Sequence, residues 1–179
     1  MGTIAKRYAK ALLLYAKECH AETVIYQQMV ALQQLYVQIP ELGKTMTNPV
    51  ISKKDKKQLL HEAVGKDTHP ALLKFLDLMV DNKREEQLLF VVHSFIDMYR
   101  KSNNIIRGKL TTAFPVAPQD EERFRLFIQR ISESHVEFET EVDKDICGGF
   151  ILQLDSWRMD ASVAHQLNLI RKQFDERNR

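Results

Sequence analysis

Two adjacent glycines in the stretch DKDICGGFILQL, Gly148 and Gly149, are the residues whose spacing most invites a chemical interpretation. Beside the thiol of Cys147, such a pair is compatible with a phosphate cradle, a redox corner or a backbone bend. A phosphate cradle requires a helix amino terminus directly after the glycines, because backbone N–H groups and the helix dipole must meet the anion. The residues that follow here, FILQL, have the composition of a strand. The sequence therefore favours a structural corner over a phosphate site.

The other histidines and cysteines form no pattern typical of catalysis. HEAVG, at His61, begins like the zinc motif H-E-x-x-H, but Gly65 stands where the second histidine is needed. The chain has no G-x-S-x-G nucleophile elbow. Cys19 lies on an apolar helical face, which predicts a buried and inert thiol, and Cys147 has no histidine partner in the sequence. We therefore expect no catalytic residue, no cofactor and no metal.

The lysine run KKDKK, residues 53–57, could contact phosphates, but it has no interleaved aromatic residues. Charge runs alone identify partners poorly, so we favour a solvated helical face and keep nucleic-acid binding as the alternative. The formal net charge of +2 is too small to argue for nucleic acid. With 44% hydrophobic and 28% charged residues, the 179-residue chain is typical of a globular protein with a sizeable core.

Neither the amino terminus nor any apolar run predicts insertion into a membrane. MGTIAKRYAK lacks the apolar segment and the cleavage site of a secretory signal, and the run from Leu88 to Ile96 is too short to span a bilayer. The two cysteines lie far apart without a CxxC motif, which predicts free thiols in a reducing compartment. We expect membrane association only through partners.

The chain is predicted to be helical up to about residue 105. Apolar residues recur there at three- and four-residue steps, and the break at Asn48–Pro49 and a capping box beginning at Ser52 delimit the helices. Five long or moderate helices and a short one at ELGKTMTN make a six-helix bundle over residues 1–105. In the first helix, Ile4, Tyr8, Ala11, Leu12, Tyr15 and Cys19 are expected on one apolar face. Ala5, Ala9, Leu13 and Ala16 widen that face, so neighbours are expected on more than one side of this helix.

After residue 105 the hydrophobic period becomes that of a small α/β unit. VEFETEVD alternates apolar and acidic residues, which is typical of a strand with one wet face, and RGKLTTAFPV and GFILQL predict two further strands. FILQL is expected beside VEFETEV. An amphipathic helix is predicted to begin at Pro118. Its apolar face consists of Phe124, Phe127, Ile128 and Ile131, and a last helix that closes the chain is defined by Val163, Leu167, Ile170 and Phe174.

The predicted fold class is therefore mainly α, with the six-helix bundle over residues 1–105 followed by a small α/β domain over residues 106–179. The junction between them, RKSNNIIRG, is short and polar.

Several separate stretches of the chain together resemble one family, the δ subunit of F-type ATP synthases, whose mitochondrial relative is the oligomycin-sensitivity-conferring protein. They are IAKRYAKALLLYA, TNPVISKKDK, DNKREEQL, LTTAFPV and EVDKDICGGFILQLDSWRMDASV. The last is the most specific, since an Asp-x-x-Ile-x-Gly-Gly strand precedes an Asp-x-Ser at the final helix. Its structural motif residues are Gly148, Gly149, Asp160 and Ser162. Two features depart from the family pattern. Ala117 stands where a capping Ser or Thr is usual, and Trp157 and Arg158 place large side chains in a turn that usually has smaller ones.

The resemblance implies a non-catalytic stator subunit that couples proton-driven rotation to ATP synthesis. It implies that the helical domain binds the amino-terminal segments of α subunits and that the second domain, especially its last helix, binds the C-terminal end of the b subunit. By resemblance we place the α-binding groove between the first helix, at Tyr8 and Leu12, and the helix containing Leu78. Periodicity cannot separate a docking face from internal packing, so internal packing of these residues is the alternative.

The resemblance further implies a peripheral location on the cytoplasmic face of the bacterial cell membrane, reached only through the complex, with no nucleic-acid partner. The first helix starts at once, without an Arg- and Ser-rich leader, which favours a bacterial chain over an organellar precursor. An adaptor unrelated to ATP synthase and a nucleic-acid binder are the competing classes.

Overall fold

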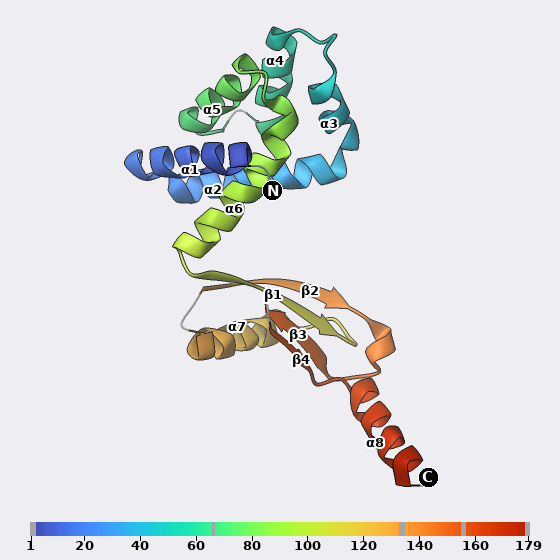
Figure 1. The fold of residues 1–179 in the computed structure, drawn as a ribbon. Coiled ribbons are helices and arrows are strands. Elements are labelled where there is room, and N and C mark those ends of the chain that lie inside the picture. Colours follow the sequence, from blue (N-terminus) through green and yellow to red (C-terminus); the bar gives the residue numbers. More distant parts are fainter. Residues whose placement is uncertain (1–2, 66, 133–134, 155–156, 178–179) are drawn as a thin grey trace. The chain divides into compact units, whose positions relative to one another are not determined.

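The computed structural model of the protein describes residues 3–65, 67–132, 135–154 and 157–177. The chain forms two compact units, Met1–Arg100 and Lys101–Arg179. Helices make up the first unit, and a sheet with two α-helices makes up the second (Figure 1). The predicted fold class, a helical bundle followed by a small α/β domain, is confirmed. The predicted division after residue 105 falls just inside the first strand, β1 (Ile105–Thr112).

Local sequence signals explain where the helices of the first unit begin and end. In chain order they are α1 (Thr3–Glu18), α2 (Glu22–Gln38), α3 (Pro40–Thr47), α4 (Lys53–Val64), α5 (Pro70–Asp81) and α6 (Leu88–Ser102), with a 3-10 turn at Glu85–Gln87. Pro40 starts α3 because proline suits a first turn but not a helix interior. The Ser52 hydroxyl accepts a hydrogen bond from the Asp55 N–H at 3.2 Å, so the predicted capping of α4 is confirmed.

Only part of the wide apolar face predicted for α1 is buried. Its buried residues are Ala5, Ala9, Leu12, Leu13 and Ala16. Ile4 and Tyr15 are 38% and 40% exposed, and Cys19 is a free, exposed cysteine, so the prediction of a buried thiol is wrong. Alanines allow neighbouring helices to approach closely, and Leu12 and Leu13 are buried beside them while Ile4 and Tyr15 stay at the surface.

The lysine run at the start of α4 is tied to neighbouring elements rather than simply solvated. Lys56 is buried and forms a 2.6 Å ion pair with Glu85 of the 3-10 turn. Lys57 pairs with the carboxylate of Asp81 at 2.8 Å, and the Lys53 ammonium donates to the Asp81 carbonyl. The expected solvated face is therefore wrong at Lys56, because α4 uses these cations to hold the end of α5 and the turn after it.

The second unit contains a four-stranded sheet in the order β2-β1-β3-β4. Its elements after β1 are α7 (Pro118–Ser132), β2 (His135–Val142), a 3-10 turn at Lys144–Ile146, β3 (Phe150–Leu154), β4 (Trp157–Asp160) and α8 (Val163–Arg177). β1 and β2 pair in parallel across the α7 connection, and the other two pairs are antiparallel.

Two expectations about this sheet are wrong. FILQL does not lie beside VEFETEV, because β1 lies between β3 and β2. Trp157 and Arg158 do not form a turn but begin β4, where Leu154 pairs with Trp157 and Gln153 with Arg158. A parallel β1–β2 pair joined by a helix leaves the other edge of β1 open for β3, and a short antiparallel hairpin then adds β4.

The core of the second unit is small. Among the residues described there, it comprises Leu110, Ile128, Val136 and Leu152, and Phe124 and Phe150 pack against this cluster. The rings of Phe124 and Phe150 meet each other edge to face, with 5.0 Å between their centroids. Phe127, on the predicted apolar face of α7, is 54% exposed. The predicted stripe of α8 is likewise at the surface, with Val163, Leu167 and Ile170 all exposed, and α8 extends away from the sheet in Figure 1. The side chains of Ile131 and Phe174 lie outside the described residues.

Candidate partner-binding site

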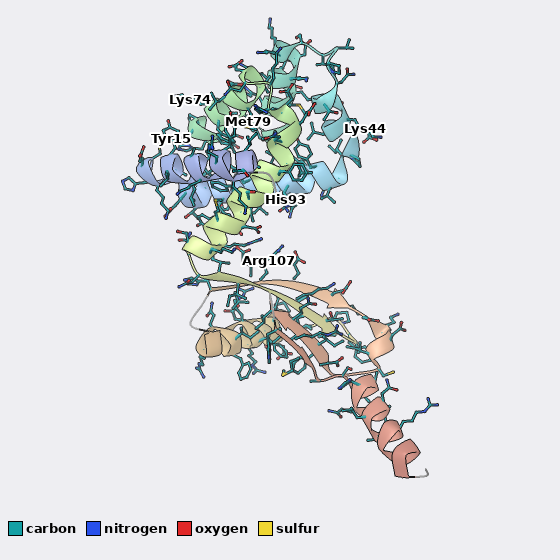
Figure 2. The ribbon with its side chains drawn as sticks, in the orientation of Figure 1. Tyr15, Lys44, Lys74, Met79, His93 and Arg107 are labelled. Atoms are coloured by element: carbon teal, nitrogen blue, oxygen red, sulfur yellow. The ribbon has the colours of Figure 1, made fainter. Side chains whose placement is uncertain are left out.

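An apolar groove of about 310 Å³ lies between α1 and α5 of the helical unit. Figure 2 labels one residue from each wall, Tyr15 on α1 and Lys74 on α5. The complete lining consists of Tyr8, Ala11, Leu12, Tyr15, Ala71, Lys74, Phe75 and Leu78. The three residues assigned to α-subunit binding from the sequence, Tyr8, Leu12 and Leu78, therefore line one groove.

These three side chains occupy different depths of the groove. Leu12 is 2% exposed and forms part of the floor, whereas Leu78 is 47% exposed at the rim. Tyr8 is half-buried, and its ring meets that of Phe75 edge to face with 6.4 Å between centroids. Internal packing thus describes Leu12 well but leaves the exposure of Leu78 without a structural reason.

Five lining residues were not assigned to the groove from the sequence, although helical spacing offers a signal for most of them: Ala11, Tyr15, Ala71, Lys74 and Phe75. Ala11 and Tyr15 follow Tyr8 at helical spacing, and Lys74 precedes Leu78 by one turn. Lys74 is the charged member of the lining, and its long stem can cover apolar surface while the ammonium stays in water. The groove is therefore suited to an amphipathic helix whose apolar stripe is flanked by an acidic residue.

The glycine corner of the second unit joins the start of β3 to the start of α8. Gly149 has a φ of 76°, and a side-chain carbon added there would collide with the carbonyl oxygen of Ala161. The Gly148 carbonyl accepts a hydrogen bond from the Val163 N–H at 3.0 Å, and the Ala161 N–H donates to Phe150. β3, not a helix, follows the glycines, so the geometry of a phosphate cradle is not present at this corner.

Asp160 and Ser162 complete the same corner by capping α8. The Ser162 hydroxyl donates to Asp160 Oδ1 at 2.6 Å and accepts from the His165 N–H at 3.2 Å. Hydrogen bonds from the hydroxyl and the N–H of Ser162 hold the pKa of Asp160 below its ordinary value. These contacts give Gly148, Gly149, Asp160 and Ser162 a local structural role.

Cys147 beside the glycines is exposed and has a φ of 61°, and its Sγ lies 3.6 Å from the Asp145 carbonyl oxygen. Within the described ranges, no group of three or more His, Cys, Asp or Glu side chains could hold a metal ion. A search of the described helices finds none long and apolar enough to cross a bilayer.

A second cleft in the α/β unit, of about 810 Å³, lies between α7 and the glycine corner. Its aromatic lining includes Phe114, Phe124, Phe127 and Phe150. Phe114 is 73% exposed. This cleft could not be predicted from the sequence, because its walls come from a loop, a helix and a strand that meet only in the folded unit.

The helical bundle followed by a mixed α/β unit defines a two-domain fold that occurs in ATP synthase assemblies. A chain in the cryo-EM structure of the Toxoplasma gondii mitochondrial ATP synthase hexamer has the same fold, with a TM-score of 0.69 and 21% identity over 97% of this chain and 98% of that one.

Residues 4–174 match the family described as ATP synthase delta (OSCP) subunit, and the chain belongs to this family. The ATP synthase subunit delta of Phocaeicola vulgatus is 39% identical over 100% of this chain and 97% of its own length. That of Bacteroides fragilis is 37% identical over the same shares. The resemblance found in the sequence is confirmed: the protein is a non-catalytic stator component that links the F1 head to the peripheral stalk of a membrane-associated complex.

Proposed function

We propose that the α1/α5 groove binds the amino-terminal segment of an ATP synthase α subunit as an amphipathic helix. The observation that carries the proposal is the exposed apolar rim at Leu78 beside the deeper floor at Leu12, within a groove that needs no rearrangement to open. Lys74 at the wall favours an acidic residue on the bound helix.

The α/β unit binds the C-terminal end of the b subunit, and α8 supplies part of the contact. Its exposed Val163, Leu167 and Ile170 lie at four- and three-residue spacing, which is the stripe that one helix presents to another. With its ends assigned to α and b, the subunit attaches to the cytoplasmic face of the bacterial cell membrane only through the complex, and it resists the torque that accompanies proton-driven rotation.

Replacing Leu78 with Glu tests the groove directly. The side chain is half exposed, so the fold should tolerate the change, while a carboxylate on the apolar rim should weaken binding of an α amino-terminal peptide about tenfold or more. Isothermal titration calorimetry measures the affinity. Phe90→Glu is the matched control, because Phe90 is 57% exposed on α6 and does not line the groove. Equal affinities for the two variants would exclude this groove as the α site.

A chain that ends after residue 105 tests whether α binds the helical unit and b binds the α/β unit. It should retain α-peptide binding and lose binding of the b C-terminal segment, measured on the same two peptides. Full b affinity in the shortened chain would contradict the assignment of b to the second unit. A stator subunit should co-purify with α, β and b. A nucleic-acid binder should instead bind nucleic acid with an affinity that falls steeply as the salt concentration rises.

A further inference from the structure

A second apolar groove in the helical unit lies between α2, α3 and α4, on other elements than the α1/α5 groove. It has a volume of about 430 Å³, and Leu35, Ile39, Leu42, Leu59 and Ala63 supply its apolar lining. Leu42 is buried at 6% exposure, whereas Ile39 is 47% exposed. The groove therefore has the same depth profile as the first, with a buried floor and an exposed aliphatic rim.

The charges at this groove are opposite to those at the α1/α5 groove. Glu41 and Glu62 line it and are exposed, and its lining includes no lysine or arginine. A 2.9 Å hydrogen bond from Gln58 orients the Glu62 carboxylate, and within the described ranges neither acid has a cationic partner. The α1/α5 groove carries Lys74 and no acid in its lining.

We propose that the α2/α3/α4 groove is a second docking site, and that it binds an amphipathic helix whose apolar stripe is flanked by lysine or arginine. The apolar floor supplies the affinity, and the two unneutralised carboxylates select the basic flanks by charge complementarity. The two grooves of the unit then discriminate between helices of similar apolar stripe by the sign of the flanking charge. This site is independent of the assignment of the α1/α5 groove.

The test uses the full chain and two synthetic helices of about 18 residues, long enough to be helical when bound. The probes share one leucine stripe, and their flanking residues are all lysine in one and all glutamate in the other. In the unmodified protein the lysine probe should bind at this groove. In the double variant Glu41→Lys and Glu62→Lys, the affinity of the lysine probe should fall about tenfold, and the affinity of the glutamate probe should rise. Unchanged affinity of the lysine probe in the double variant would overturn the proposal.

Ile39→Asp locates the binding on the structure. Ile39 is exposed and occupies the N-cap of α3, where aspartate is favoured, so the fold should tolerate the change while the groove loses its rim. Binding of the lysine probe should be lost in Ile39→Asp and retained in Leu78→Glu, the matched change at the other groove. The opposite result would place the probe at α1/α5 and overturn the proposal. Self-association of the unmodified chain that Ile39→Asp abolishes, measured by analytical ultracentrifugation, would identify a second copy as the occupant and also overturn it.

Discussion

The two units of the chain differ in how much of their apolar surface they bury themselves. In the helical unit every α-helix contributes a fully buried large side chain, among them Leu12, Ile25, Met46, Leu60, Leu72 and Leu88. In the described part of the α/β unit the buried cluster comprises four residues. Both units expose large apolar side chains, such as Phe90 in the first and Phe114 in the second, so the units differ mainly in the size of the buried core. Because apolar burial is the main stabilising contribution, we expect the helical unit to be the more stable and the α/β unit to gain stability from its partner.

This difference suggests a division of mechanical roles. A groove in a well-buried bundle is formed before its partner arrives, so binding there requires little ordering and can be tight for a small contact area. A unit with a small core and large exposed apolar surface becomes rigid when a partner covers that surface. A stator needs both properties, because it must dock on the head and also resist torque at the stalk.

The largest effect on stability is expected from Gly149→Val, which should destabilise the α/β unit and leave the helical unit unchanged. A β-branched residue is strained at the positive φ of this position, and its Cβ collides with the Ala161 carbonyl. We expect a loss of about 3 kcal/mol or more in the free energy of unfolding of that unit, together with lost b binding. Urea unfolding followed by fluorescence of Trp157, the single tryptophan, reports on this unit.

The control for this change is Gly43→Ala in α3. The nearest atoms to an added Cβ there belong to the Tyr36 ring at 3.8 Å, an ordinary contact, and alanine is favoured over glycine in a helix by about 1 kcal/mol. The control should not destabilise the helical unit. If Gly149→Val abolished nucleotide binding while the fold stayed intact, the corner would be a phosphate site after all.

The second prediction concerns the helical unit, where Lys56→Ala should cost about 3 kcal/mol. The change leaves Glu85, whose side chain is 12% exposed, without its cation, and an unpaired buried charge is strongly destabilising. Lys54→Ala, an exposed neighbour in the same run, should change stability by at most about 0.5 kcal/mol. Urea unfolding followed by far-ultraviolet circular dichroism compares the two variants. Equal stabilities would mean that the ion pair contributes nothing to the bundle.

The same ion pair gives the helical unit a predictable pH dependence. Burial raises the pKa of Glu85, but hydrogen bonds from Lys56 and the backbone outweigh it, so the pKa lies below its ordinary value. A group with a depressed folded pKa stabilises the fold above its unfolded pKa and loses that contribution as the pH falls through the folded value. The stability difference between the unmodified protein and Lys56→Ala should therefore narrow on acidification. A constant difference from neutral to acidic pH would contradict this.

The helices and their boundaries could be predicted because the signals are local. Ser52 caps its own helix, and Pro70 and Pro118 begin theirs, within one turn of chain. The order of the strands could not be predicted in this way. FILQL is compatible with pairing to either neighbour, and only the crossover through α7, which places β2 on one edge of β1, leaves the other edge for β3.

The candidate groove could be predicted only in part for a similar reason. The apolar residues of α1 cover more than one face, and periodicity does not tell which face packs against α2 and α5 and which stays open. The structure buries Ala5, Ala9 and Ala16 and leaves Tyr8, Ala11 and Tyr15 at the groove. The family resemblance identified Tyr8, Leu12 and Leu78, but the lining contributed by Lys74 and the whole α2/α3/α4 groove depend on side chains that meet only in the fold.

Removing the N-cap side chain of α4 and of α8 tests whether the two units support their helices differently. Ser52→Ala and Ser162→Ala each remove an N-cap hydrogen bond, with a cost of about 1 kcal/mol. The two helices differ in support, since α4 buries Leu60 in the bundle whereas Val163, Leu167 and Ile170 of α8 are exposed. Amide hydrogen exchange should show that α4 stays protected in Ser52→Ala and that α8 frays in Ser162→Ala. Equal loss of protection in both helices would remove the distinction drawn here.

The smallest effect on folding is expected from Leu167→Gln on α8. Leu167 is 57% exposed, and glutamine has a helix propensity close to that of leucine, so the free energy of unfolding should change by at most about 0.5 kcal/mol. The same change removes the middle residue of the Val163, Leu167 and Ile170 stripe, so affinity for the b C-terminal segment should fall although the fold is unchanged. Arg171→Gln is the matched control, because Arg171 is exposed and lies outside that stripe. If Leu167→Gln lowered stability as much as a core substitution, α8 would be packed within its own unit in solution, and the contrast between a self-sufficient bundle and a partner-completed α/β unit would fail.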